Sequence, residues 1–272
     1  MILATISFGG AARHKPSDLE DLVLNYLAAA LHNGQICGEY FYAWKNGRLN
    51  AYVHLAGPEA LAAKHHAKWS KERLKEVTRV FRRKPRCVIL QDPAPQRSAG
   101  WSRAPFLYLF TNAFSSEPPV SRGDTGASVP LYLLPLSYED RAQLYSWQSS
   151  YASHDDIWLG SGTLEIPAYR ELATPASELS QHGRDLCRTI ETATGIPTFY
   201  YLMRYWGRPE GEDMRKCPGC GRRWRTQYPA SEDLPFWHFH FRCDRCRLVS
   251  HLGVSMDGGR HTRIGDYHDA KA

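Results

Sequence analysis

Apolar and polar residues in the first third of the chain alternate with the periods of strands and helices. A period of two residues predicts a strand, and apolar residues three to four positions apart predict a helix. Asn46-Gly47 separates two strand-like runs and favours a tight hairpin turn, because both residues accept positive φ. In chain order the predicted elements are a strand over 1–8, a helix from Ser17 to Gly34, strands over 39–45 and 48–55, a helix over 58–81 and a strand over 86–91.

This order, β-α-β-β-α-β, is that of the split βαβ or ferredoxin-like fold, in which two helices cover one face of a four-stranded antiparallel sheet. We therefore predict an α+β protein whose first domain, residues 1–111, is ferredoxin-like. Phe41, Tyr42 and Trp44 lie on one predicted strand, but the glycine and basic context of an RNA-binding strand motif is missing around them.

The middle of the chain changes in character. Residues 92–128 are rich in Pro, Ser and Gly, which is typical of loops, and they bracket a short apolar strand at 106–110. Residues 129–206 are predicted to form a mainly helical, aromatic-rich segment. Within it we expect an edge strand over 129–134 and helices from Ser137 to 154–156, from Pro167 onward, and from Thr174–Pro175 to Gly195.

Two Cys-x-x-Cys pairs, Cys217/Cys220 and Cys243/Cys246, follow this segment, twenty-two residues apart. Each pair can wrap a tight turn around one metal ion, and two pairs close a tetrahedral shell of four thiolates. The spacing predicts a structural Zn²⁺ site in a zinc ribbon over residues 214–252, followed by a polar tail over 253–272. A complete sulfur shell leaves no position for a catalytic water.

Two other uses of these cysteines are weaker. Disulfide bonds would need an oxidising compartment, and the N-terminal residues show no secretory signal pattern. A redox-active Cys-x-x-Cys could be formed by either pair, but two pairs at ribbon spacing favour a metal.

Basic and aromatic residues surround the cysteines. Arginine side chains could pair with phosphates, and exposed rings could stack on bases. Alternatively, the rings pack around the metal and the arginines form an ordinary solvated face. The candidate residues for binding nucleic acid or a protein partner are Arg222, Arg223, Trp224, Arg225, His238, His240, Arg242, Arg245 and Arg247.

Composition is that of a globular protein. The chain has 272 residues, 43% of them hydrophobic, which suffices for two or three units with a buried core. The net charge of +6 is mild and suggests an acidic partner only locally. No apolar run approaches the about 20 residues needed to cross a bilayer, so we expect a cytoplasmic protein with reduced cysteines and no membrane partner.

Several segments together resemble an uncharacterised bacterial family described as zinc-ribbon-containing, with a suggested nucleic-acid-binding role. The resemblance spans residues 131–252 and implies a role only for the zinc ligands Cys217, Cys220, Cys243 and Cys246. The segments that carry it are LPLSYEDRAQLYSWQ (134–148), DIWLGSGTLE (156–165), GRDLC (183–187), TGIPTFYYLMRYWG (194–207), CPGCGRRW and CRLVS.

Three functions are compatible with these patterns. The first is non-catalytic binding of nucleic acid through the basic, aromatic ribbon. The second is a protein-interaction role, such as an immunity or antitoxin protein that neutralises a toxin. The third is an enzyme with a site in residues 137–206, but no phosphate loop or nucleophile motif is present, and we assign no catalytic residue.

Overall fold

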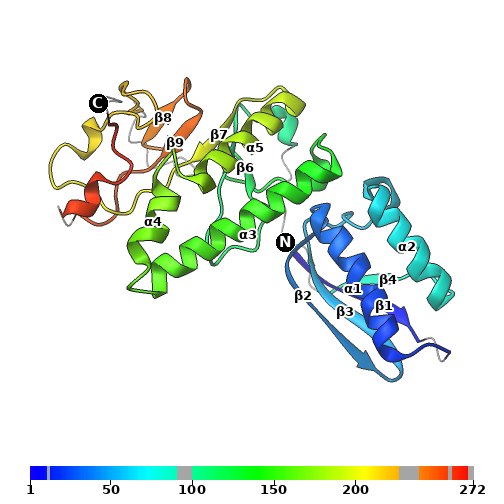
Figure 1. The fold of residues 1–272 in the computed structure, drawn as a ribbon. Helices are drawn as coiled ribbons and strands as arrows, with labels where there is room; N and C mark the ends of the chain where they lie inside the picture. Colours follow the sequence, from blue (N-terminus) through cyan, green and yellow to red (C-terminus); the bar gives the residue numbers. More distant parts are fainter. Residues whose placement is uncertain (11–12, 91–99, 227–238, 257–258, 269–272) are drawn as a thin grey trace. The chain divides into compact units, whose positions relative to one another are not determined.

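The computed structural model describes residues 1–10, 13–90, 100–226, 239–256 and 259–268 (Figure 1). It is a mixed α+β structure, and its contacts divide the chain into two compact units. The first unit comprises residues 1–98, 115–118 and 128–145, and the second comprises residues 99–114, 119–127 and 146–272.

The first unit contains a four-stranded antiparallel sheet with strand order β2-β3-β1-β4. Two helices pack side by side on one face of this sheet (Figure 1). The elements are β1 (Ile2–Gly9), α1 (Pro16–His32), β2 (Ile36–Lys45), β3 (Arg48–Leu55), η1 (Ala63–His65), α2 (Lys68–Phe81) and β4 (Arg86–Ile89). The predicted order of strands and helices is confirmed.

The core of the first unit lies between the sheet and the helices. In β1 the buried residues are Ile2, Ala4, Ile6 and Phe8, and they belong to one apolar cluster with buried residues of α1 and α2. Since side chains alternate along a strand, the residues between them lie on the opposite face of the sheet.

The second helix is shorter than predicted. Residues 58–62 form turns, and α2 begins only at Lys68. The side-chain amide of Gln35 donates to the Ala60 carbonyl at 2.5 Å, which holds this segment against the end of α1 instead of in a helix.

The second unit contains a five-stranded sheet with strand order β6-β5-β7-β9-β8. The central strands β5, β7 and β9 run parallel, and β6 and β8 are antiparallel edges. Its strands are β5 (Leu107–Leu109), β6 (Val120–Arg122), β7 (Thr198–Tyr201), β8 (Phe241–Cys243) and β9 (Leu248–Ser250). Its longer helices are α4 (Glu165–Ala173) and α5 (Glu178–Thr194), and α3 (Tyr138–Gly160) contributes to both units. Short 3-10 helices are η2 (Trp101–Arg103), η3 (Leu131–Leu133), η4 (Glu212–Met214) and η5 (Arg260–Arg263).

The β8–β9 hairpin, which carries Cys243 and Cys246, is part of this sheet. β9 pairs with β7, which follows the helical segment, so both segments belong to the same compact unit. The sequence patterns divide this part of the chain further, into a 129–206 segment, a 214–252 ribbon and a tail. The division into two compact units does not test those boundaries, so they stay predictions.

Three element boundaries differ from the predictions. Residues 131–133 form a 3-10 helix rather than an edge strand. α3 continues to Gly160 instead of ending at 154–156, and the Asp155 carboxylate within it accepts the Ala113 N–H at 2.8 Å. α5 is capped by Ser177, not by Thr174, through the Ser180 N–H.

The start of α3 is as predicted. The Ser137 hydroxyl accepts the Asp140 N–H at 3.0 Å, and the Asp140 carboxylate accepts the Ser137 N–H at 3.2 Å. This reciprocal pair satisfies two donors at the helix start. Within the described residues, no helix is both long and apolar enough to cross a membrane.

Gly183 allows α5 to lie close to the sheet. A Cβ atom at this position would be 2.4 Å from Tyr200 Cε2 and 2.7 Å from Trp147 Nε1, and both of those side chains are fully buried. Two of the largest side chains in the core therefore pack directly against the helix backbone.

We predict that Gly183→Ala destabilises the second unit by about 1–3 kcal/mol, because the added methyl group overpacks this contact. Gly160→Ala is the matched control, since a Cβ atom on this α3 glycine meets nothing within 4 Å. Urea unfolding followed by tryptophan fluorescence measures both variants. Equal stability of the two variants would contradict the close packing of α5.

Candidate metal centre

The four cysteines predicted as metal ligands converge. The Sγ atoms of Cys217, Cys220, Cys243 and Cys246 all lie within 4.8 Å of one another. The Cys220 and Cys243 Sγ atoms are 3.7 Å apart. A tetrahedral ion with metal–sulfur bonds of about 2.3 Å needs sulfur atoms about 3.8 Å apart, so the four thiols can hold one metal ion.

Backbone hydrogen bonds fix the first cysteine turn. The Cys217 N–H donates to the Arg222 carbonyl at 2.8 Å, and the Gly221 N–H donates to the Cys217 carbonyl at 2.8 Å. Gly221 has φ +72°, a conformation that costs glycine little. Gly219 is also constrained, because a Cβ atom there would be 3.0 Å from Cys246 Sγ.

The second cysteine pair lies on the β8–β9 hairpin. Cys243 ends β8, and Cys246 lies in the turn, which closes through Arg247 at φ 51°. The sheet thus fixes the position of one pair, and the hydrogen-bonded turn fixes the other.

Two of the four thiols, those of Cys217 and Cys246, favour the protonated state in the metal-free protein. At Cys220, burial is outweighed by hydrogen bonds from the Arg222 backbone and the neighbouring thiols, which lower the pKa of that thiol. Burial raises the pKa of Cys217, and burial together with the neighbouring Cys220 thiol raises that of Cys246 to about 12. Metal binding therefore releases protons, and affinity falls as the pH is lowered. Four thiolates around a divalent ion carry a net negative charge.

The aromatic residues near the cysteines are buried. Trp224 is 2% exposed and stacks on the fully buried Phe241 ring, with centroids 5.0 Å apart and planes at 22°. The prediction that Trp224 is available to a ligand is therefore wrong. Its ring packs on Phe241 of β8, two residues before Cys243, in agreement with the alternative in which the aromatic residues form a small core near the cysteines.

The predicted basic residues divide into two groups. Arg222, Arg223 and Arg245 have exposed side chains, and we call these three residues the knuckle arginines. They come from both cysteine turns, two directly after Gly221 and one between Cys243 and Cys246.

The other arginines have partners within the protein. Arg225 donates to the His240 carbonyl at 3.0 Å. Arg242 pairs with Asp244 at 2.8 Å, and its guanidinium lies 4.6 Å from the Phe199 ring centroid.

Arg247 also has an internal role. It makes a two-pronged contact with Glu191 of α5, with nitrogen–oxygen distances of 2.7 and 3.0 Å. This ion pair ties the second cysteine turn to the helix.

The histidines supply little positive charge. His238 lies outside the described residues. Burial lowers the pKa of His240, and burial together with the nearby His240 lowers that of His251 to about 4. Both rings are therefore mainly neutral near pH 7, and neither joins the metal-binding cysteine group among the described residues.

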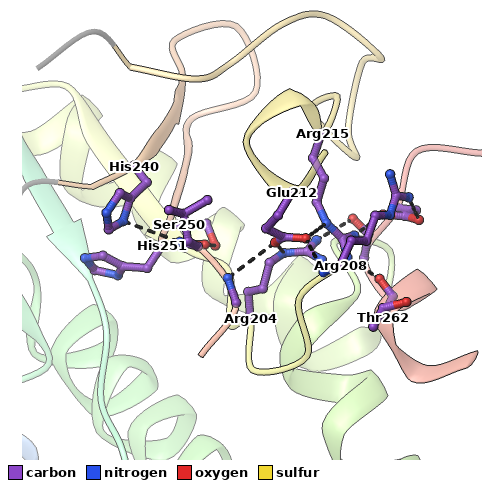
Figure 2. Close-up of polar contacts among 12 residues, drawn as sticks. Arg204, Arg208, Glu212, Arg215, His240, Ser250, His251 and Thr262 are labelled. Carbon is purple, nitrogen blue, oxygen red and sulfur yellow. Dashed lines mark hydrogen bonds and ion pairs between the residues drawn. The ribbon is translucent and has the colours of Figure 1, made fainter. Parts of the chain in front are cut away.

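A buried network of charged residues lies beside the first cysteine turn, and the sequence patterns did not identify it (Figure 2). Arg215, only 3% exposed, pairs with Glu212 at 2.5 Å and also contacts Asp266 and the Thr262 carbonyl. Arg204, 4% exposed, donates to the Gly265 carbonyl at 3.0 Å. Since Asp266 also pairs with Arg208, the network joins three parts of the second unit.

This network holds part of the predicted polar tail against the rest of the second unit. Thr262 is 5% exposed, and Asp266 is held by two arginines. A Cβ atom on Gly221 would lie 2.8 Å from the Tyr267 ring, so the segment also contacts the first cysteine turn. Residues 259–268 thus support the metal centre.

A groove separates the first cysteine turn from α5. It has a volume of about 490 Å³ and is lined by Pro218 and Gly219 on one side and by Arg184 and Arg188 on the other. Arg188 is exposed and pairs with the neighbouring Asp185. Asp185 also lines the groove, which therefore carries two arginines and one carboxylate.

Several polar residues in or near the 137–206 segment, where an enzyme site was considered, have structural partners. Tyr200 is fully buried, its hydroxyl lies 3.3 Å from the Ser180 hydroxyl, and burial raises its pKa. The Tyr169 hydroxyl accepts the Tyr205 N–H at 2.7 Å, and Glu191 pairs with Arg247. These contacts account for the positions of the three side chains without a catalytic role.

Three family models match the chain, and none of their descriptions names an activity. A domain of unknown function, DUF2310, covers residues 102–203. Two further domains of unknown function, DUF8589 and DUF8594, cover residues 1–91 and 207–256.

Two uncharacterized proteins of Haemophilus influenzae are similar to the chain. One is 40% identical over 146 residues, which are 53% of this chain and 70% of that protein. The other is 31% identical over 239 residues, which are 81% of this chain and 86% of that protein.

One solved structure, a crystal structure of an antibiotic biosynthesis monooxygenase, resembles part of the chain. It covers 35% of this chain and all of the other, at 13% identity and a TM-score of 0.26. A likeness this weak supports no statement about activity.

We predict that Cys217→Ser abolishes stoichiometric metal binding and unfolds β8 and β9, because metal-binding energy contributes to folding. Elemental analysis measures the bound metal, and hydrogen exchange should show lost protection in β7 to β9 with the first unit unchanged. Cys87→Ser on the exposed strand β4 is the control. Metal retained at one ion per chain in Cys217→Ser would contradict the four-sulfur site.

We predict that Arg215→Met costs about 3–5 kcal/mol, because it removes the shortest ion pair of the buried Glu212 carboxylate and one of the two arginines that pair with Asp266. Arg188→Met removes an exposed pair instead and should cost at most about 1 kcal/mol. Thermal unfolding of the two variants distinguishes the outcomes. A similar small loss in both would show that the buried network does not stabilise the second unit.

Proposed function

This chain belongs to the family of the two uncharacterized Haemophilus influenzae proteins, and from that premise we propose that it is a zinc-ribbon protein that binds nucleic acid without catalysis. In this proposal the metal is structural and the knuckle arginines contact phosphates. The first unit, with its β-α-β-β-α-β order, is assigned to the ferredoxin-like class.

The chemistry of the donor set favours zinc. Four thiolates in a tetrahedral arrangement are typical of structural Zn²⁺ sites. Cys217, Cys220, Cys243 and Cys246 would fill all four positions, so the ion would have no site for substrate or water. Its role would be to hold the two cysteine turns together.

The observation that carries the proposal is the exposure of Arg222, Arg223 and Arg245 on both cysteine turns. Their backbones are fixed by the metal ligands beside them, while their side chains remain accessible. Arginine on a rigid turn loses little conformational freedom when it binds a phosphate. The other described ribbon arginines predicted to bind, Arg225, Arg242 and Arg247, have partners within the protein.

The burial of Trp224 determines the mode of binding at this site. Without an exposed ring on the described part of the ribbon, contacts to phosphates dominate over stacking on bases. Phosphate contacts carry no sequence information directly. We therefore propose electrostatic, sequence-tolerant binding, with the groove beside Arg184 as an extension of the same surface.

The knuckle arginines could instead offset the negative charge of the metal–thiolate centre. The two roles differ in their consequences. If charge compensation were their main role, replacing them would weaken metal retention and leave nucleic-acid affinity unaffected at equal metal content. Metal content must therefore be measured in every variant.

We predict that Arg222→Gln/Arg223→Gln/Arg245→Gln weakens binding to duplex DNA and lowers the salt dependence. Each lost phosphate contact should reduce the slope of log affinity against log salt by about 0.9. Fluorescence anisotropy with a labelled duplex over a salt series measures this on the zinc-loaded protein. A single-stranded probe in parallel shows which form is preferred.

Arg170→Gln is the control, because Arg170 is exposed on α4 outside the cysteine turns. It should leave the slope unchanged. The proposal fails if the triple variant, with full metal content, binds with the affinity and slope of the wild type, or if the wild type shows no salt-dependent binding.

A further inference from the structure

The sheet of the first unit has a second face, opposite α1 and α2, which we call the open sheet face. Strand register aligns four residues in a row across it: Phe41 of β2, Tyr52 of β3, Thr5 of β1 and Val88 of β4. These residues alternate with the buried ones, so all four side chains are on the same face.

This row is exposed although three of its members are large and apolar. Phe41 is 65% exposed, Tyr52 is 39% exposed and Val88 is 42% exposed. Directly opposed residues on neighbouring strands have Cβ atoms about 5 Å apart, so the two aromatic side chains are neighbours on this face.

Polar and basic residues continue the same face. The next row contains Asn50, Ser7 and Arg86 in register. Lys45 and Arg48 pair where the β2–β3 hairpin closes, and both are exposed. The two rows and the hairpin end consist of described residues paired in register. None of these described residues is Asp or Glu.

We propose that the open sheet face binds single-stranded nucleic acid. Phe41 and Tyr52 would stack on two bases, and Lys45, Arg48 and Arg86 would contact the phosphates along the strand. Aromatic rings on a sheet with flanking cations are the general chemistry of single-strand recognition. Asn50 and Ser7 offer hydrogen-bonding groups between the rings and Arg86.

Charge favours this occupant over a second copy of the chain. A two-fold interface presents the same surface from both subunits. Lys45, Arg48 and Arg86 of two copies would bring cations together, and like charges across an interface oppose association. Glu39, exposed two residues before Phe41 on β2, is an acid on the same face. A polyanion with exposed bases complements both the charge and the rings.

The inference does not depend on the knuckle arginines, because the two surfaces belong to different units and share no residue. The decisive variant is Phe41→Leu/Tyr52→Leu, which keeps apolar side chains but removes both rings. We predict that it binds a fluorescein-labelled oligouridine RNA at least about tenfold more weakly than the wild type. Lys45→Gln/Arg48→Gln/Arg86→Gln should lower the salt slope by about 0.7 per lost contact.

Trp44→Leu is the matched control. Trp44 lies on the same strand, but its ring donates to Glu20 of α1 at 2.6 Å, so it is on the helix side of the sheet. Its RNA affinity should stay within about twofold of the wild type. The ribbon triple variant, measured in the same assay, separates the two proposals, because loss of RNA binding in that variant alone would leave only the ribbon proposal standing.

Two results would overturn the proposal for the open sheet face. One is unchanged RNA affinity in Phe41→Leu/Tyr52→Leu with an unchanged melting temperature. The other is sedimentation showing a wild-type dimer that this variant dissociates, since the face would then be an interface between copies. If the variant is destabilised, Phe41→Leu alone, at the most exposed position, repeats the RNA test.

Discussion

The convergence of four sulfur atoms on one point is the constraint on which the functional surface depends. Cys217 and Cys220 are placed by a hydrogen-bonded turn, and Cys243 and Cys246 are placed by a hairpin that β9 joins to the parallel part of a sheet. A metal ion at this point would fix a turn with little secondary structure against a rigid sheet. Every exposed arginine near the cysteines derives its position from that connection.

The surroundings of the cysteines show how a small site is stabilised without a large core. Trp224 stacks on Phe241 of β8, the strand that ends at Cys243. Beside the metal centre, the Arg215 network fixes residues 259–268 against the first turn, and Arg247 pairs with Glu191 of α5. Because these arginines are used internally, the exposed knuckle arginines, together with the exposed Lys216, are the cations left for a ligand on the described ribbon. The first unit offers a chemically different surface, with rings as well as cations.

Local patterns in the sequence predicted the features that depend on neighbouring residues. The Cys-x-x-Cys pairs, the Asn46-Gly47 turn with both residues at positive φ, and the Ser137–Asp140 cap are of this kind. The predictions that failed concern side chains whose contacts are with residues distant in the chain. Trp224 is buried by Phe241 across the β8 strand, Arg247 meets Glu191 of a preceding helix, and Asp266 meets Arg215 from the C-terminal segment. Alternation and spacing carry no information about such contacts, so an arginine that will be paired cannot be distinguished by pattern from one that will be exposed.

X-ray absorption at the zinc edge of the purified protein tests the central claim most directly, because it reports both the metal and its ligands. The account predicts one zinc ion per chain surrounded by sulfur alone at about 2.3 Å. A protein without zinc, or a zinc shell containing nitrogen or oxygen in place of one of the four sulfurs, would contradict it.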